Sequence, residues 1–189
     1  MKMVSIDTTR LVERTVKDQV LTAFRLCELY GHSLMEDEEV GALLQELDLR
    51  IGATQNAMSS AGIVRECADC AGNDQGTCCG VRTGYKSGSV LLLINLLLGR
   101  SLPSGPSDTS LCYFLTERGC ALRARHVICV NFICQRLKDA IPHDALCKVQ
   151  EIAGREIDIL FTLEECVNKK MSRGALSASP ASSGPDRNL

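Results

Sequence analysis

The sequence predicts an all-α fold, a small helical bundle packed around an irregular, cysteine-rich region. Apolar residues recur at helical spacing in three long stretches, at about 7–30, 34–60 and 142–171. Between the second and third stretches this periodicity is lost, glycines are frequent, and eight of the eleven cysteines occur. Because 189 residues are enough to bury a core, we expect one compact domain with a tail.

The first two helices are expected to form a hairpin over residues 1–62. The apolar stripe of the first helix consists of Val12, Val16, Val20, Phe24 and Cys27. Gly31 is expected to end this helix, and Ser33 with Glu36 has the spacing of a capping box for the next one. The acidic residues from Glu36 to Glu39 suit the positive end of a helix dipole. Two helices joined by such a short turn should pack antiparallel.

Residues 63–141 make up the cysteine-rich region. Its first part, up to residue 88, shows no periodicity and is expected to be irregular backbone. Residues 89–99 should form a short helix that is apolar on every side and therefore covered all round. A turn-rich linker over residues 101–110 and a short helix near residues 127–137 are expected to follow.

A third long helix, over residues 142–171, should complete the bundle. Its apolar stripe consists of Leu146, Val149, Ala153, Ile157, Leu160, Leu163 and Val167. The last stretch, residues 172–189, is rich in small and polar residues and contains proline, which is typical of a disordered tail.

Charge and hydropathy exclude several classes of protein. The formal net charge is −2 and there is no long basic run, which argues against nucleic-acid binding. The N-terminal residues carry charges throughout and lack the apolar core of a secretion signal. The longest apolar run, residues 90–98, is about half the length of a membrane helix. We therefore expect a cytoplasmic protein with no membrane partner, and the sequence leaves open whether a protein partner or a second copy binds.

Eight cysteines fall into two clusters. The first is Cys67-Ala-Asp-Cys70, followed after seven residues by the vicinal pair Cys78-Cys79. The members of the second cluster are Cys112, Cys120, Cys129 and Cys134. Persistent disulfides are rare in a reducing compartment, whereas soft thiolates are the ligands that zinc and iron–sulfur centres need. These eight cysteines are therefore predicted to bind Zn²⁺ or an iron–sulfur cluster such as [4Fe–4S].

The spacing leaves the number of centres open. Eight thiolates could fill two four-ligand sites, one [4Fe–4S] cluster plus one zinc site, or one cluster with spare thiols. Adjacent side chains point in different directions, so Cys78 and Cys79 are suited to different centres. Four thiolates around Zn²⁺ leave a net charge of about −2, which requires donors or cations nearby. The candidate cations are Arg118, Arg123, Arg125, Arg136 and Lys138, and His126 is a candidate ligand or proton-transfer group.

The three remaining cysteines are expected to play no part in these sites. Cys27 lies on the apolar stripe of the first helix and is interpreted as a small core residue. Cys147 and Cys166 are nineteen residues apart on one helix, so at a rise of about 1.5 Å per residue they cannot share a metal.

The order C-x2-C, then CC, then CxFL...GC.L..R...C..F.C resembles the YkgJ-type, CxxCxxCC family of zinc- or iron-chelating proteins. The resemblance covers about residues 64–137. It implies a small cytoplasmic bacterial protein whose ligands are the eight cysteines of the two clusters. Two departures stand out: the gap before the vicinal pair is longer than usual, and Arg125-His126 replaces an Arg-Pro.

Two further functions stay open. The flagellin lysine methylases are similar in the cysteine motif, which implies an iron–sulfur-dependent methyl transfer as the alternative. The short chain and the lack of a recognisable methyl-donor site or acid/base constellation argue against it.

A thiol redox protein would use C-x2-C as its exchange pair, but the strand and helix order of thioredoxin-like proteins is missing. No catalytic residue can be assigned, so whether the protein is an enzyme is left open.

Overall fold

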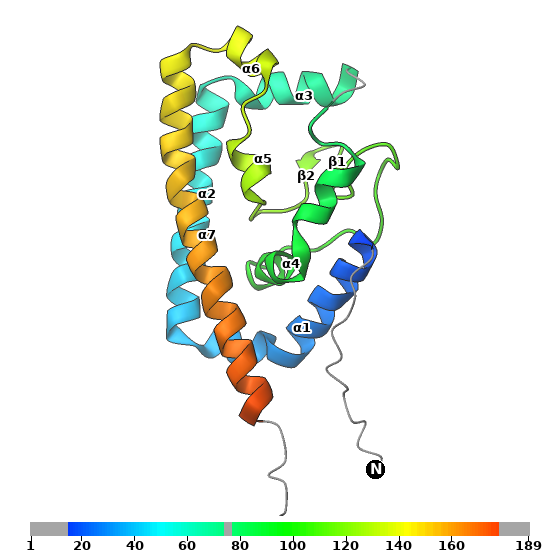
Figure 1. Ribbon diagram of the computed structural model, residues 1–189, viewed down its shortest axis with the longest axis vertical. Coiled ribbons are helices and arrows are strands. Elements are labelled where there is room, and N and C mark those ends of the chain that lie inside the picture. Colours follow the sequence, from blue (N-terminus) through cyan, green and yellow to red (C-terminus); the bar gives the residue numbers. More distant parts are fainter. Residues whose placement is uncertain (1–14, 74–76, 178–189) are drawn as a thin grey trace, which may run out of the picture.

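The computed structural model describes residues 15–73 and 77–177, and this part of the chain is mostly helical (Figure 1). The helices are α1 (Val16–Glu36), α2 (Glu38–Ser60), α3 (Ile63–Asn73), the 3₁₀ helix η1 (Val81–Lys86), α4 (Gly88–Leu97), α5 (Val127–Asn131), α6 (Gln135–Ala140) and α7 (His143–Ser177). A short hairpin pairs β1 (Leu115–Thr116) antiparallel with β2 (Gly119–Cys120). This architecture confirms the predicted all-α class. Residues 7–14 of the first predicted helix and residues 178–189 of the predicted tail lie outside the described residues.

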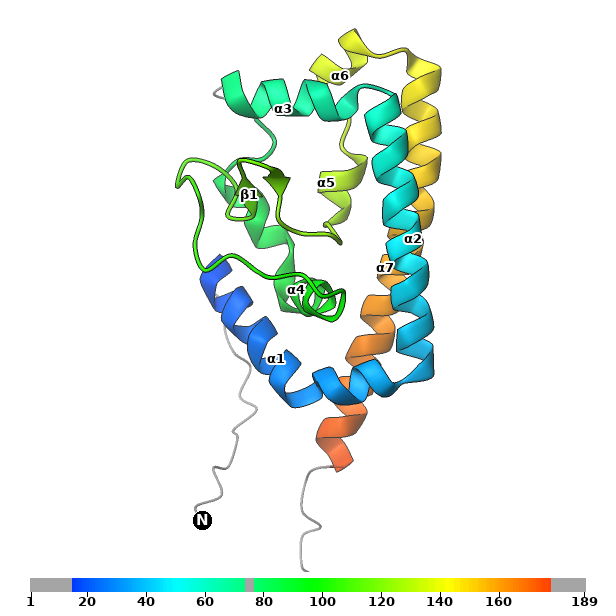
Figure 2. The ribbon, with the colours of Figure 1, turned by 180° about the vertical axis from the view of Figure 1, so that it is seen from behind.

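The most extensive contact between helices runs along α2 and α7, which lie side by side (Figure 1, Figure 2). α1 diverges from α2 after their connection and packs mainly on α4. The expected antiparallel packing of the first two helices therefore does not extend beyond their connection. The long apolar stripe of α7 takes that place against α2.

α1 begins after Thr15, which forms a reciprocal capping box with Asp18. The Asp18 N–H donates to Thr15 Oγ1 at 3.1 Å, and the Thr15 N–H donates to Asp18 Oδ2 at 2.9 Å. The helix continues through Gly31 to Glu36, so the predicted end at Gly31 is wrong. A Cβ at this buried position would come within 3.1 Å of Cys27 Sγ. Close packing of Cys27, rather than a turn, accounts for the glycine.

A single residue, Asp37, separates α1 from α2. Its backbone is extended, and its Oδ1 accepts hydrogen bonds from the Glu39 and Val40 N–H groups, each at 3.1 Å. Lys170 of α7 pairs with Asp37 at 2.5 Å and with Glu39 at 3.1 Å. The predicted capping box of Ser33 and Glu36 is wrong, because Asp37 is the residue that caps α2. Glu38 and Glu39 do begin this helix, as expected, whereas Glu36 ends α1. Lys170 links Asp37 and Glu39 to α7.

The glycine-rich stretch after α2 contains two helical elements. Gly62, with φ at +81°, turns the chain, and α3 follows at once with the buried residue Ile63. The prediction of irregular backbone is therefore wrong for residues 63–73 and 81–86. Contacts with distant residues support α3, among them the ion pair of Arg136 with Glu66 at 3.2 Å. Such contacts leave no local pattern in the sequence.

α4 lies at the centre of the core, as its apolar character predicts. Leu92, Leu93 and Ile94 are fully buried, and Gly99, with φ at +72°, follows the end of the helix. The largest apolar cluster joins α4 to the C-terminal end of α1, to α2 and to α7, and includes Leu34, Val40, Leu44, Leu47, Ile51, Leu91, Leu93, Ile94, Leu160, Leu163 and Val167. A second cluster packs α1, α4 and the β-hairpin together. Burial of α4 thus connects the long helices to the segments that carry the cysteines.

The last third of the chain follows the prediction in outline. Two short helices, α5 and α6, replace the one expected near residues 127–137. The predicted helix over residues 142–171 is present as α7, which extends to Ser177, so the expected tail is wrong for residues 172–177. Residues 101–110 contain no helix or strand, as expected for a linker. None of the described helices combines the length and the apolar character needed to cross a membrane.

Candidate metal centre

The eight predicted ligands lie on short elements between α2 and α7. Cys67 and Cys70 are on α3, the vicinal pair precedes η1, and the others lie on or beside β1, β2, α5 and α6. Neighbouring thiolate charges raise the pKa of several of these thiols, which links all eight into one network. We call Cys67, Cys70, Cys78, Cys79, Cys112, Cys120, Cys129 and Cys134 the thiol cluster. The structure therefore brings both sequence clusters into one region.

Four of these thiols are grouped around Cys67. Cys67 and Cys70 are three residues apart on α3, so they share one face of that helix. Burial raises the pKa of Cys67, and the charges of Cys78, Cys134 and Cys70 raise it further. Cys134 immediately precedes α6, which is held to α3 by the ion pair of Arg136 with Glu66. This group therefore combines two helices with the first residue of the vicinal pair.

The other four thiols are grouped around Cys129 and the β-hairpin. The Cys112 N–H donates to the carbonyl of Cys79 at 2.7 Å, which fixes these two backbones side by side. Cys120 ends β2 and lies opposite Leu115 of β1. Burial raises the pKa of Cys129 to about 11, and the charges of Cys120, Cys112 and Cys78 contribute to this shift. This group therefore combines the second residue of the vicinal pair with the hairpin and α5.

The vicinal pair connects the two groups. A hydrogen bond from the Cys79 thiol lowers the pKa of Cys78 to about 6, and the same bond raises the pKa of Cys79. Cys78 contributes to the raised pKa of both Cys67 and Cys129, one from each group. The vicinal pair thus lies between the groups, and the hydrogen bond from Cys79 makes Cys78 the more acidic of the two thiols.

Arg125 is the basic residue whose charge acts on thiols from several elements. Burial raises the pKa values of Cys67, Cys120 and Cys129, and the positive charge of Arg125 opposes this rise at each of the three thiols. Its Nη2 lies 3.9 Å from Met58 Sδ, and its Nε is buried without a hydrogen-bond partner among the described residues. A guanidinium in this position is suited to stabilise negative charge on the thiols.

Asn95 of α4 holds the segment that presents Arg125. This residue is fully buried, and its Oδ1 accepts hydrogen bonds from the Arg123 N–H at 2.7 Å and the Ala124 N–H at 3.1 Å. Its Nδ2 donates to the carbonyls of Leu91 and Ala124, each at 2.9 Å. Sequence analysis missed Asn95, although it is the one polar residue in the apolar run of residues 90–98.

Two of the other predicted basic residues bind carboxylates elsewhere. Arg123 pairs with Asp48 of α2, and Arg136 pairs with Glu66 of α3. Arg123 contacts Asp48 at 2.7 Å and the Gln55 Oε1 at 2.7 Å, both on α2. The structure gives His126 a structural contact, because its Nδ1 accepts the Ile128 N–H at 3.2 Å and caps α5. Burial, with the nearby charge of Lys86, lowers the pKa of His126.

The donor atoms suit a soft metal, but their spacing in the structure is wider than coordination requires. Within residues 15–73 and 77–177, no three side chains of Cys, His, Asp or Glu are close enough together to hold one metal ion. The thiol cluster thus offers the right ligands in the right region, and binding would require the thiols to approach one another.

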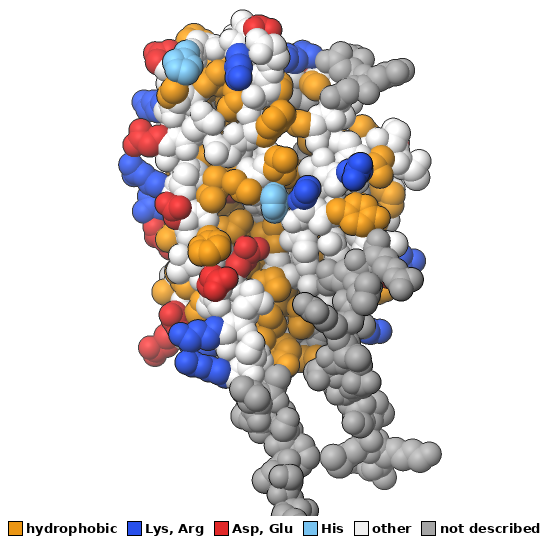
Figure 3. Space-filling model, in the orientation of Figure 1, with side chains coloured by type: hydrophobic (Ala, Val, Ile, Leu, Met, Phe, Trp, Pro, Cys, Tyr) orange, Lys and Arg blue, Asp and Glu red, His pale blue; other side chains and the backbone are white. Residues whose placement is uncertain are grey.

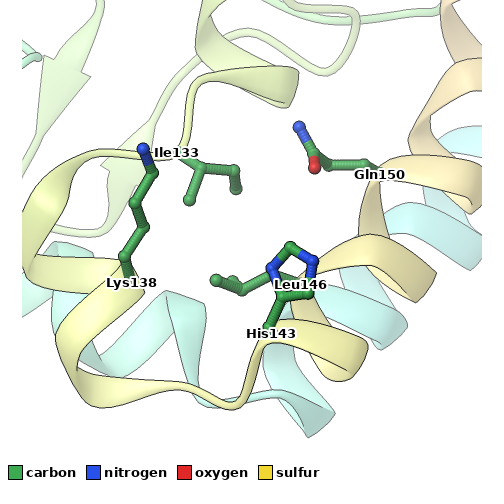
Figure 4. A pocket seen from close by; sticks show the side chains of 5 residues that line it. All are labelled: Ile133, Lys138, His143, Leu146 and Gln150. Carbon is green, nitrogen blue, oxygen red and sulfur yellow. The ribbon is translucent and has the colours of Figure 1, made fainter.

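Other features lie outside the thiol cluster. A hollow of about 420 Å³ between α6 and the start of α7 is lined by Ile133, Lys138, His143, Leu146 and Gln150 (Figure 4). Cys147 is exposed, with its Sγ 3.5 Å from His143 Nε2, whereas Cys166 is buried and Cys27 packs against the main core. Hydrophobic side chains also gather on the face shown in Figure 3. Val127 and Ile128 of α5, and Phe132 just after it, are among the exposed large hydrophobic residues.

Comparisons with protein-family models, curated proteins and solved structures gave no match for this chain.

Proposed function

We propose that this chain is a metal-binding protein in which the thiol cluster coordinates Zn²⁺ or an iron–sulfur cluster. The observation that carries the proposal is the convergence of eight thiols, far apart in sequence, on short elements between α2 and α7, where the Arg125 charge acts on Cys67, Cys120 and Cys129. Thiolates and a nearby cation are the two components that a cysteine-ligated centre needs. The resemblance to the YkgJ-type family supports the same assignment and the cytoplasmic location that it implies.

We further propose two centres of four ligands each. The charges of Cys70, Cys78 and Cys134 act on Cys67, and those of Cys112, Cys120 and Cys78 act on Cys129. Cys112 and Cys129 also act on Cys79, and we assign Cys78, which acts on both groups, to the centre of Cys67. The vicinal pair would then contribute one thiolate to each centre, since adjacent side chains point in different directions. Four thiolates satisfy the coordination of a tetrahedral zinc or of a [4Fe–4S] cluster.

Metal binding would also supply folding energy to the region. The short elements that carry the thiols must move together for coordination, and a bound metal offsets the entropy that this ordering costs. Arg125 would compensate the net negative charge of the thiolates. The long helices would serve as the frame on which both centres are assembled.

Anaerobic purification, followed by elemental analysis and a visible absorption spectrum, tests the proposal. Colourless protein with about two zinc ions per chain indicates two structural sites, whereas brown protein with iron and sulfide indicates a cluster. Protein that binds neither zinc nor iron at stoichiometric level contradicts the proposal. Metal-free protein whose thiols are mostly oxidised after anaerobic purification would point to thiol redox chemistry instead.

Single cysteine variants test the division into two centres. We expect Cys70→Ala and Cys120→Ala each to remove about half of the bound metal, because each variant damages one centre. Cys147→Ala is the matched control, since this exposed cysteine lies outside the thiol cluster. Unchanged metal content in either ligand variant would contradict the ligand assignment, and complete loss in both would favour a single shared centre.

A further inference from the structure

Cys147, near the start of α7, is the one exposed cysteine outside the thiol cluster. Cys166 is buried, and Cys27 is partly buried and packs against the main core. In cysteine chemistry the thiolate is the nucleophile, so a reactive cysteine needs access to solutes and a group that takes its proton. Exposure gives Cys147 the first of these.

His143 places a base beside this thiol. Its Nε2 lies 3.5 Å from Cys147 Sγ, which is a hydrogen-bond distance when sulfur takes part. The two residues are four positions apart on α7, so the helix keeps their side chains on one face. A neutral imidazole accepts a thiol proton and can return it to a leaving group. Cys147 and His143 therefore form a nucleophile and base pair.

His143 also lines the hollow between α6 and the start of α7, which connects the pair to a candidate binding site (Figure 4). The hollow has a volume of about 420 Å³, within the range of about 300–1,000 Å³ that is typical of small-molecule sites. Ile133 and Leu146 supply apolar surface, and Lys138 brings an ammonium group. No acidic residue lines the hollow in the part of the chain that the structure describes. These groups favour a small molecule that carries a carboxylate.

We propose that Cys147 forms a mixed disulfide with a small disulfide that bears carboxylates, with His143 as the base and the hollow as the binding site. Exchange with a disulfide requires a thiolate, a proton acceptor and access, which are all present here. The Cys147 thiolate attacks one sulfur of the bound disulfide, whose S–S bond breaks as the new S–S bond forms. Cys147 is thereby oxidised and the other half of the small disulfide is reduced. That half leaves as a thiol, with the proton that His143 took from Cys147.

Two disulfides serve as probes, oxidised glutathione, which carries carboxylates, and bis(2-hydroxyethyl) disulfide, which is uncharged. Each is incubated with the full chain near neutral pH, and the remaining thiols are then alkylated. Non-reducing peptide mapping by mass spectrometry gives the rate of mixed-disulfide formation at each cysteine separately. We expect Cys147 to react with oxidised glutathione at least about tenfold faster than Cys27, which lacks both exposure and a neighbouring base.

His143→Gln tests the base. We expect the rate at Cys147 to fall at least about tenfold with both probes, because the thiol loses its proton acceptor. His32→Gln is the matched control, since His32 pairs with Glu36 at 3.0 Å on an exposed face of α1. We expect it to leave the rate at Cys147 unchanged. An unchanged rate in His143→Gln, or a Cys147 that reacts no faster than Cys27, would overturn the inference.

Lys138→Gln tests the hollow. We expect the rate at Cys147 to fall about three- to tenfold with oxidised glutathione and to stay the same with the uncharged disulfide. Lys169→Gln removes the same charge from an exposed position toward the other end of α7, so both rates should equal those of the wild type. A loss with both probes, or with neither, would overturn the assignment of the hollow. These rates are read at Cys147 alone, whereas the proposed function is read from metal content, so the two can fail separately.

Discussion

The long helices and the short elements that carry the thiols are stabilised in different ways. α1 and α2 each bury six residues, and α4 buries five. By contrast, α5 buries only Val130 and α6 buries only Leu137. In α3, Ile63 is the one buried residue among the positions whose burial is described. The long helices are thus stabilised by apolar burial, whereas the thiol-bearing elements depend on hydrogen bonds, ion pairs and, by our proposal, metal.

This difference assigns separate tasks to the two regions. A frame with its own core can fold without a ligand, while elements with one buried side chain each are free to adjust their positions. Adjustment is what the thiol cluster needs, since its members are not yet within coordination distance in the part of the chain that the structure describes. The following predictions test this division, from the largest expected effect to the smallest.

Leu47→Ala should destabilise the frame most. Leu47 is fully buried in the cluster that joins α2 to α7, so we expect a loss of about 2–5 kcal/mol in the free energy of unfolding by urea. The loss should be the same with and without a chelator. Leu49→Ala, on the same helix but 69% exposed, should change stability by less than about 0.5 kcal/mol. Similar effects of the two variants would contradict the predicted role of the α2–α7 core.

Asn95→Ala should act where α4 holds residues 123 and 124, the segment next to the thiol cluster. It leaves the half-buried Arg123 N–H and the buried Ala124 N–H without their acceptor, at an expected cost of about 1–3 kcal/mol. Hydrogen exchange at these two amides should accelerate in the variant. Asn168→Ala, at an exposed position of α7, serves as the control. Unchanged exchange at residues 123 and 124 would show that Asn95 does not hold this segment.

Glu156 should make stability depend on pH. Its pKa is raised by burial, so the folded state binds the proton more tightly than the unfolded state, and stability is highest below the unfolded pKa of about 4.5. As pH rises through the folded pKa, wild-type stability should fall relative to Glu156→Gln by at most about 1.4 kcal/mol per pH unit. Urea unfolding from pH 4 to 8, with a chelator present, measures this difference. A constant difference between the two proteins would contradict the raised pKa.

Arg136→Ala should have the smallest effect on global stability. The ion pair with Glu66 is partly exposed, so we expect a cost of about 0–1 kcal/mol. Amide exchange in α3 should nevertheless accelerate, because this pair fastens α6 to α3. Arg155→Ala removes an exposed ion pair within α7 and should leave α3 unaffected. Faster exchange in α2 or α7 than in α3 would contradict the local role of Arg136.

The spacing of apolar residues along the sequence predicted the helices that bury an uninterrupted apolar run or stripe. The apolar run at residues 89–99 and the stripe of the C-terminal helix both identify helices that the structure contains as α4 and α7. The errors occur where a distant contact decides the outcome. α3 receives an ion pair from Arg136, seventy residues from Glu66, and α7 rather than α1 packs along α2. Neither contact can be inferred from neighbouring residues.

The site was predictable in composition but not in arrangement. Cysteine spacing predicts the eight cysteines as ligands, which stays a prediction, and Arg125 was one of five candidate cations. The charge interactions of Cys67 and Cys129 with other thiols and with Arg125 come from the structure. Asn95 and Glu156 were missed because each is a single polar residue on an apolar surface. For Glu156 a signal existed, since it lies three residues after Ala153 and four before Leu160 on the buried stripe of α7. An acid at such a position is a reason to look for a buried counter-charge.

The backbone contact between Cys79 and Cys112 has a consequence for how the two cysteine segments meet. This hydrogen bond, with the adjacent bridge of Gly80 to Leu111, closes a loop of the chain that contains all of α4. Insertion of α4 among the long helices therefore draws both ends of the loop to the same place. Apolar burial of α4 contributes free energy that offsets part of the entropy of closing that loop. Contacts of the chain itself thus hold the two distant cysteine segments side by side.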